Sequence, residues 1–239
     1  SIVWRQLINA LRRSRNVLVV LISMAIVSGP LLVMASDEIP VVTLFSGAFF
    51  VAVFILPKAI VFDFRSDLDI IGNFKVLPIS PWKLSIGQLL TPVIISSLIE
   101  LFTVCGIALF LNSTMCIVFV SIIPFLIPFN ILLYGLENLF FLLFPAPLVP
   151  VGRLDFDFLG RTMVQFTVTA TFLIAGCFLA AYAGQVMFGM SNGAWLSSVA
   201  TAWFILTLLA LSLLPLLSWA FKQFDVNNFK NIYLPYNLG

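Results

Sequence analysis

Six apolar blocks, each long enough to cross a bilayer, constrain this chain more than any other feature of its sequence. About 20 consecutive apolar residues span the hydrocarbon core as an α-helix, and lipid requires the backbone to satisfy its own hydrogen bonds. Charged residues make up only 9% of the chain, too few to cover a water-soluble fold. We therefore predict an all-α integral membrane protein with a six-helix transmembrane domain over residues 16–221. The expected spans are 17–35, 41–61, 84–111, 116–144, 163–188 and 195–221.

The distribution of basic residues predicts the topology. If the amino terminus is cytoplasmic, all 12 lysines and arginines lie on the cytoplasmic side, in residues 1–15, 58–83, 145–162 and 222–239. Such asymmetry follows the positive-inside rule. We expect a multi-pass protein of the cell membrane (inner or plasma membrane), with cytoplasmic loops 62–83 and 145–162 and both termini in the cytoplasm. The net charge of +2 gives no support for a nucleic-acid partner.

The two ends of the chain differ from its apolar blocks. Trp4, Leu7, Ile8 and Leu11 follow helical spacing opposite a basic face, which predicts an amphipathic interfacial helix over residues 1–15. The alternative is a basic flank that anchors the first span. Residues 222–239 form a polar cytoplasmic tail. Because the sequence starts at Ser1 without methionine, we expect a fragment or a processed piece of a longer permease.

The sequence lacks the motifs of a catalytic protein. It contains no histidine, the usual general base and metal ligand, and no G-x-x-x-x-G-K-[ST] phosphate-binding loop. The three cysteines lie within apolar blocks, where they are expected to be buried hydrophobic side chains. We therefore expect no catalytic residue, no metal site and no cofactor in this chain, and a membrane enzyme is the least favoured function.

Two acids lie within predicted spans. Glu100 is near the middle of the third span, and Glu137 lies towards the inner end of the fourth, which also carries Asn130. A charged carboxylate in the bilayer centre is costly, so it usually faces protein or a water-filled path. These three residues are candidates for a translocation path. The alternative is a set of polar contacts between helices, in which a protonated or hydrogen-bonded carboxyl keeps two helices in register.

The fifth span carries a ladder of small residues. Gly176, Ala180 and Gly184 are spaced four apart, so they lie on one helix face. We expect this face to let a neighbouring helix approach closely.

The cytoplasmic loop 62–83 is the most informative polar stretch. Ser66 can cap a short helix whose first turn carries two acids and whose apolar side chains share one face. Pro78 ends this helix, and Ser80 and Pro81 start the next one. The apolar face needs a cover, which favours docking of a partner over a structural elbow. The residues expected to couple to a partner are Asp67, Leu68, Asp69, Ile71, Phe74, Pro78, Ser80 and Pro81.

This loop, with its exit "LPISPWKLSIGQLL", resembles the first intracellular loop of type-2 ATP-binding-cassette exporter permeases. The stretches "FDFRSDLD" and "ENLFFLLFP" are similar to a bacterial group of such exporters. The resemblance implies an amphipathic helix before the first span and a coupling helix that docks on a separate cytoplasmic P-loop ATPase, which holds the ATP and Mg. Many such permeases have an extracellular re-entrant hairpin between spans five and six, for which Phe188–Trp195 leaves little room.

The expected function is therefore the permease subunit of an ATP-driven ABC exporter, working as a homodimer or with a second transmembrane half. The spans have few polar groups, which favours a lipid-like or amphipathic cargo over an ion. The main alternative is an ion- or proton-coupled carrier that uses the intramembrane glutamates. A membrane scaffold or assembly factor is a third class.

Overall fold

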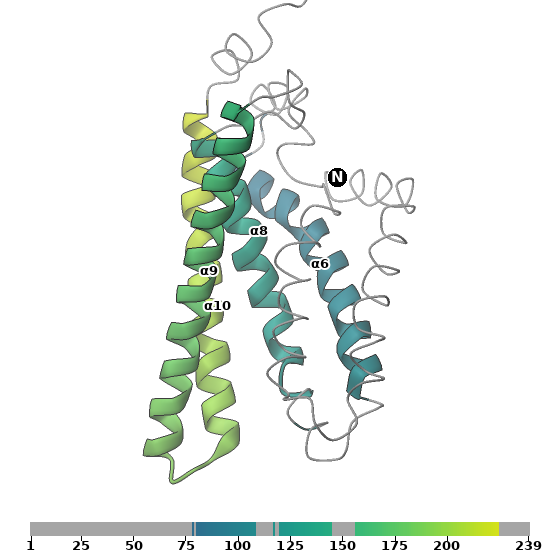
Figure 1. Ribbon diagram of the computed structural model, residues 1–239, viewed down its shortest axis with the longest axis vertical. Helices are drawn as coiled ribbons and strands as arrows, with labels where there is room; N and C mark the ends of the chain where they lie inside the picture. Colours follow the sequence, from purple (N-terminus) through teal and green to yellow (C-terminus); the bar gives the residue numbers. More distant parts are fainter. Residues whose placement is uncertain (1–77, 79, 109–116, 118–119, 145–155, 225–239) are drawn as a thin grey trace, which may run out of the picture.

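The computed structural model describes four long helices and one short 3-10 helix (Figure 1). The described residues are 78, 80–108, 117, 120–144 and 156–224. The predicted interfacial helix 1–15, the spans 17–35 and 41–61, the loop segments 62–77 and 145–155, and the tail beyond residue 224 lie outside them. All four long helices contain stretches long and apolar enough to cross a membrane, which confirms an all-α bundle for this part of the chain.

Helix α6 spans Pro81–Ala108 and corresponds to the third predicted span. It starts at Pro81, as expected for a proline in the first helical turn, and the Ser80 carbonyl accepts a hydrogen bond from Leu84 N at 3.2 Å. The predicted helix start at Ser80 and Pro81 is confirmed, and the predicted span begins three residues later, at Leu84, because the apolar block begins there. Its 28 residues reach about 42 Å, well beyond the hydrocarbon core of about 30 Å.

The fourth predicted span is divided by its prolines. A 3-10 helix, η2, covers Ile123–Phe125 and contains Pro124, and α8 follows at Leu126–Leu143. Pro128 is the third residue of α8, where its missing N–H removes no helical hydrogen bond. The predicted kink therefore takes the form of a short 3-10 turn before a regular helix. The stretch that can cross the membrane is Ile123–Leu143.

Helix α9, Phe156–Met190, is longer than expected. We predicted a span over 163–188 and a cytoplasmic loop up to residue 162, but residues 156–162 are helical. The sequence predicts a loop here because this stretch is polar. A charged helical turn outside the apolar block is stable, so the membrane boundary and the helix boundary need not coincide.

A tight turn joins α9 to α10, which spans Trp195–Gln223. Asn192 and Gly193 adopt positive φ angles of 53° and 85°, and Gly193 N donates to the Phe188 carbonyl at 3.0 Å. This is the reversal expected after a helix that ends in a left-handed residue. Only four residues separate the two helices, so this turn holds no re-entrant hairpin, as the sequence indicated.

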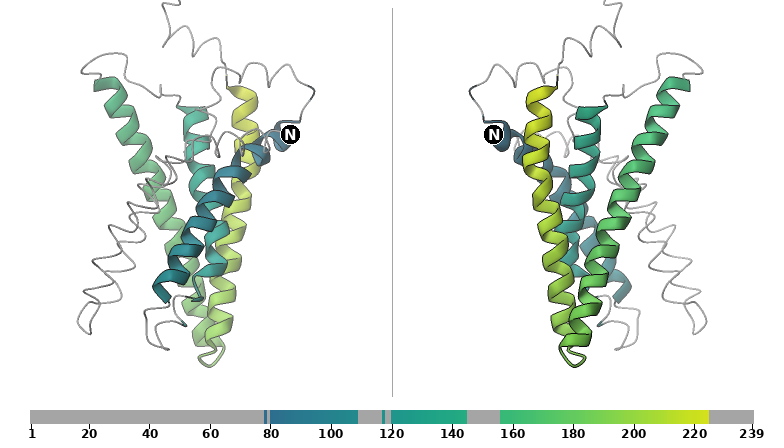
Figure 2. Two further views of the ribbon diagram at one scale, coloured as in Figure 1. Left: turned by 90° about the vertical axis from the view of Figure 1, so that its right-hand side faces the viewer. Right: turned by 90° about the vertical axis from the view of Figure 1, so that its left-hand side faces the viewer.

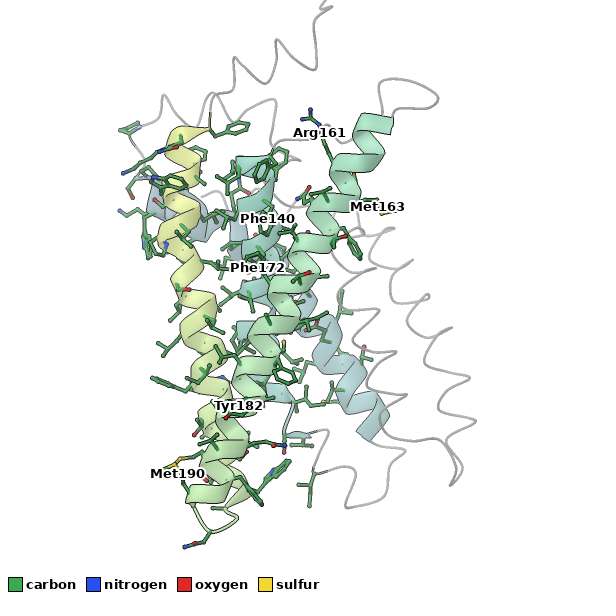
Figure 3. All side chains as sticks on the ribbon, turned by 60° about the vertical axis from the view of Figure 1, so that its left-hand side comes forward. Phe140, Arg161, Met163, Phe172, Tyr182 and Met190 are labelled. Carbon is green, nitrogen blue, oxygen red and sulfur yellow. The ribbon has the colours of Figure 1, made fainter. Side chains whose placement is uncertain are left out.

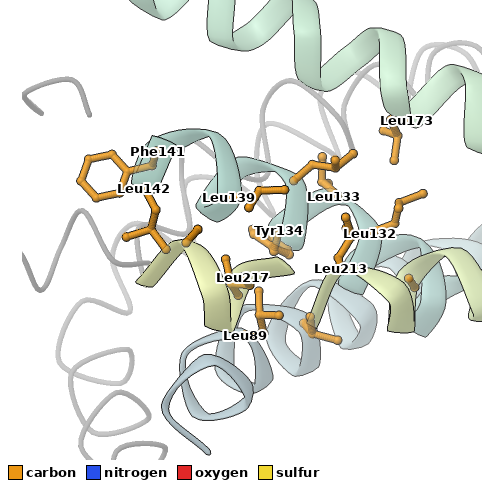
Figure 4. Close-up of a cluster of buried hydrophobic side chains, with 14 of the residues drawn as sticks. Leu89, Leu132, Leu133, Tyr134, Leu139, Phe141, Leu142, Leu173, Leu213 and Leu217 are labelled. Carbon is orange, nitrogen blue, oxygen red and sulfur yellow. The ribbon is translucent and has the colours of Figure 1, made fainter. Parts of the chain in front are cut away.

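Helix α10 packs against each of the other three long helices, and α8 also contacts both α6 and α9. Helices α9 and α10 meet at their connecting turn and diverge towards the other end of the bundle (Figure 2). The bundle interior is apolar, with leucines contributed by every long helix (Figure 4). Its members include Leu89 of α6, Leu133 of α8, Leu173 of α9, and Leu213 and Leu217 of α10.

The outer surface of α9 suits a lipid environment. The candidate span in α9, Gly160–Met190, is the least buried of the four candidate spans. Figure 3 shows the length of this helix between Arg161 near one end and Met190 at the other, with Phe172 lying against Phe140 of α8 at a ring separation of 5.9 Å. Its exposed apolar side chains include Val164, Phe172, Ile174, Phe178, Leu179 and Tyr182.

The described basic residues gather at one end of the bundle. Lys83 lies near the start of α6, Arg161 near the start of α9, and Lys222 near the end of α10. These helix ends lie at the same end of the bundle, opposite the turn that joins α9 to α10, although α9 and α10 are well separated there (Figures 1 and 2). The arrangement agrees with a charged side and an uncharged side of the membrane; which side is cytoplasmic stays a prediction.

Candidate membrane-embedded polar site

Buried polar side chains form a row along α6. Ser85, Gln88, Ser96 and Glu100 all lie in the interior. Their spacing of three, eight and four residues keeps them near one face of a helix with 3.6 residues per turn. Buried polar groups in an otherwise apolar bundle need partners, because each unsatisfied group costs roughly 1–3 kcal/mol. We therefore expect hydrogen-bonding groups of a neighbouring helix opposite this row of α6.

Helix α8 presents the complementary row. Asn130, Tyr134 and Asn138 are spaced four apart and are buried. The hydroxyls of Ser96 and Tyr134 share a hydrogen bond, and one turn away Asn130 bonds to Glu100. A step of four residues forward along α6 matches a step of four residues back along α8. The two helices are thus antiparallel and joined by successive polar contacts.

The Glu100 carboxyl is the centre of this site. Asn130 Nδ2 donates to Glu100 Oε2 at 2.6 Å and to Ser97 Oγ at 3.1 Å. Glu100 is only 7% exposed and Asn130 is fully buried. Glu100 Oε1 and Asn130 Oδ1 have no hydrogen-bond partner among the described residues. The arrangement can hold a proton or orient a polar group, because both free atoms are acceptors.

Glu137 does not join this cluster. It lies on α8 seven residues after Asn130, which is about 10 Å along the helix axis. Its side chain is half-buried, and its backbone carbonyl accepts a hydrogen bond from Gln165 Nε2 of α9 at 3.2 Å. The structure thus places the two intramembrane acids at separate levels of the bundle, with Asn130 beside Glu100.

The small residues of α9 lie at contacts with neighbouring helices. A Cβ atom on Gly176 would be 3.2 Å from Leu132 of α8, and one on Gly184 would be 3.0 Å from the Ser198 carbonyl oxygen of α10. Ala180, between them, is buried. This face therefore receives α8 and α10 at distances that larger side chains would not allow.

An apolar groove opens beside the polar site. It has a volume of about 450 Å³ and lies between α6 and the start of α8. Ser97 is the polar side chain among its described lining residues, and the same hydroxyl accepts the hydrogen bond from Asn130. The groove therefore borders the Glu100 cluster through one serine. Its apolar lining includes Ile86, Leu90, Ile94, Leu98, Ile127 and Ile131.

The residues expected to couple to an ATPase fall mostly outside the described ranges. Of that set, the structure describes Pro78, Ser80 and Pro81. Pro78 and Ser80 are exposed, and Pro81 is the first residue of α6. The coupling role of these three residues, and of the other five from Asp67 to Phe74, stays a prediction.

Several buried polar residues were not singled out from the sequence. Gln88 and Asn138 are fully buried, and Thr91 and Thr169 are buried with hydroxyl oxygens that have no partner among the described residues. The spacing of Asn130, Tyr134 and Asn138 was a usable signal, because polar residues repeated every four positions within an apolar block lie on one face. Thr169 offered no such signal, since threonine is common in membrane helices.

Comparison with protein-family models, with characterised proteins and with solved structures finds no match to this chain.

Proposed function

We propose that this chain is the membrane-spanning permease subunit of an ATP-driven exporter, and that a separate cytoplasmic ATPase moves it through the loop 62–83. The observation that carries the proposal is the connection of this loop to the bundle. The loop continues directly into α6 at Pro81, and α6 is joined to α8 by the bonds between Ser96 and Tyr134 and between Glu100 and Asn130. Because α10 packs against both helices, a push on the loop would be transmitted through the bundle.

The energy source in this proposal is a partner protein. The sequence contains no phosphate-binding loop, so ATP and its Mg²⁺ would be bound by the ATPase. ABC exporters use two transmembrane halves, which the resemblance implies here as a homodimer or as pairing with a second permease chain.

The proposed cargo is lipid-like or amphipathic. The groove between α6 and α8 is almost entirely apolar, and its volume of about 450 Å³ lies within the range of small-molecule sites. Its contact with Ser97 would provide one polar group beside an apolar chain. This combination suits an amphipathic molecule better than a hydrated ion.

The test is co-purification of the protein with its cellular partners. We expect a P-loop ATPase to co-elute with the wild type and to be lost in Ile71→Asp and Phe74→Asp, which place a charge on the apolar face of the predicted coupling helix. Asn73→Asp adds the same charge on another face and should retain the ATPase. Absence of any ATPase from the wild-type sample, or its retention by both apolar-face variants, would contradict the proposal.

A second candidate function is an ion- or proton-coupled carrier. It is favoured by one observation: the buried carboxyl of Glu100 lies within the candidate span Pro81–Cys105, and its Oε1 has no hydrogen-bond partner among the described residues. In that case transport would follow a proton gradient, would need no ATPase and would be abolished by Glu100→Gln. Transport that continues in this variant, or that depends on ATP alone, would exclude the carrier.

A further inference from the structure

In the described part of the chain, the contact between Glu100 and Asn130 leaves one oxygen on each side chain without a hydrogen-bond partner. The amide nitrogen of Asn130 has two hydrogens, and both are used, one by Glu100 Oε2 and one by Ser97 Oγ. Glu100 Oε1 and Asn130 Oδ1 then have no partner among the described residues, although both atoms are buried. The carboxyl of Glu100 and the amide of Asn130 are both planar, and they are already joined by the hydrogen bond from Asn130 Nδ2 to Glu100 Oε2. One further hydrogen, placed between Glu100 Oε1 and Asn130 Oδ1, would complete the hydrogen bonding of this contact.

The surroundings limit what can supply this hydrogen. A buried water needs a cavity of at least about 10–15 Å³, and neither oxygen exposes appreciable surface to a water-sized probe. The described lysines and arginines, Lys83, Arg161 and Lys222, lie near helix ends rather than beside Glu100. A proton on the carboxyl itself occupies no additional volume.

We propose that Glu100 retains its carboxyl proton and donates it from Oε1 to Asn130 Oδ1, so that acid and amide form a closed ring of two hydrogen bonds. In this ring the Asn130 N–H donates to Glu100 Oε2, and the Glu100 O–H donates to Asn130 Oδ1. One hydrogen satisfies both unused oxygens, and no covalent bond is broken. The pair is a neutral protonation site between α6 and α8, and with the bond between Ser96 and Tyr134 one turn away it holds the two helices in antiparallel register.

The ring makes a specific prediction about substitutions. Glutamine at position 100 supplies an N–H and a carbonyl in the places of the acid O–H and carbonyl, so Glu100→Gln can rebuild both bonds with Asn130. Alanine can rebuild neither. We therefore expect Glu100→Gln to unfold at the wild-type temperature in detergent micelles, whereas Glu100→Ala and Asn130→Ala unfold at lower temperatures. The double alanine variant should lose less than the sum of the two single losses, because both single variants remove the contact between Glu100 and Asn130.

Infrared difference spectroscopy provides a second measurement that does not depend on stability. The wild type should show the carbonyl band of an undissociated carboxylic acid, and this band should disappear in Glu100→Gln and shift in Asn130→Ala. Glu137→Gln is the matched control and should keep the band. The proposal is overturned if Glu100→Gln removes no acid band, or if it lowers the unfolding temperature as far as Glu100→Ala does. Either result would indicate that Glu100 does not form the protonated ring with Asn130.

The inference does not rest on the proposed function. Loss of the ATPase from co-purification would leave the infrared band unchanged, and loss of the band would leave ATPase binding through loop 62–83 unaffected. The two failures are therefore distinguishable.

Discussion

Replacement of Gly184 by alanine would place a methyl group at a close contact between α9 and α10. The new Cβ would stand 3.0 Å from the Ser198 carbonyl oxygen and 3.2 Å from both Ser198 Oγ and the Ala202 Cβ. The carbonyl belongs to the α10 backbone, so it cannot rotate away as a flexible side chain would. The substitution should therefore push the two helices apart.

The magnitude follows from two opposing contributions. Alanine favours a helix over glycine by up to about 1 kcal/mol, and overpacking of a close contact costs typically about 1–3 kcal/mol. Gly160 lies on the same helix, and a Cβ there meets nothing within 4 Å, so Gly160→Ala carries the first contribution without the second. The difference in the free energy of unfolding between the two variants should therefore be about 1–3 kcal/mol.

The assay is denaturant-induced unfolding of both variants and the wild type in the same detergent. We expect Gly160→Ala to match or exceed the wild type and Gly184→Ala to be less stable than Gly160→Ala, with a larger loss for Gly184→Leu. Equal changes for the two alanine variants would refute the close approach of α9 and α10 at this level.

Three further predictions concern other parts of the bundle. Tyr134→Phe removes the hydroxyl that bonds to Ser96 and should lower the free energy of unfolding by about 0.5–1.5 kcal/mol; unchanged stability in the same assay would contradict the bond. Thr169→Val removes a buried hydroxyl without a partner among the described residues and should be neutral or stabilising by up to about 1 kcal/mol, whereas a clear loss would reveal a partner. In a background without native cysteines, Asn192→Cys should react with an impermeant maleimide from outside the cell and Lys222→Cys only after permeabilisation; the reverse pattern would invert the topology.

The existence of the described helices could be predicted from hydropathy, but several of their ends could not. Apolar blocks locate helices because lipid provides no hydrogen-bond partner for the backbone. The start of α9 at Phe156 was missed because a helix can continue through charged residues outside the apolar core. The start of α6 at Pro81 was predicted separately, from the local chemistry of a serine followed by a proline.

The polar site was predictable only as separate residues. Glu100 and Asn130 were both candidates, with a translocation path and a contact between helices left open. The sequence does not indicate that they bond to each other, because 30 residues separate them and the register of α6 against α8 depends on how their side chains pack. Tyr134 opposite Ser96 was likewise not predicted, although the polar spacing on α8 pointed to that face.

Hydropathy alone was enough to locate helices long and apolar enough to cross a membrane, and the sequence names the polar residues within them, because both follow from the chemistry of single residues and of continuous blocks. The packing of the helices was needed to show which polar groups meet, that α10 contacts the other three long helices of the described part, and that Glu100 and Glu137 lie at different levels. The physical reason is that apolar surface is interchangeable in lipid, so hydropathy does not choose a helix's neighbours. Close contacts such as that at Gly184 and directional hydrogen bonds such as that between Glu100 and Asn130 make this choice, and both depend on the relative positions of helices distant in sequence.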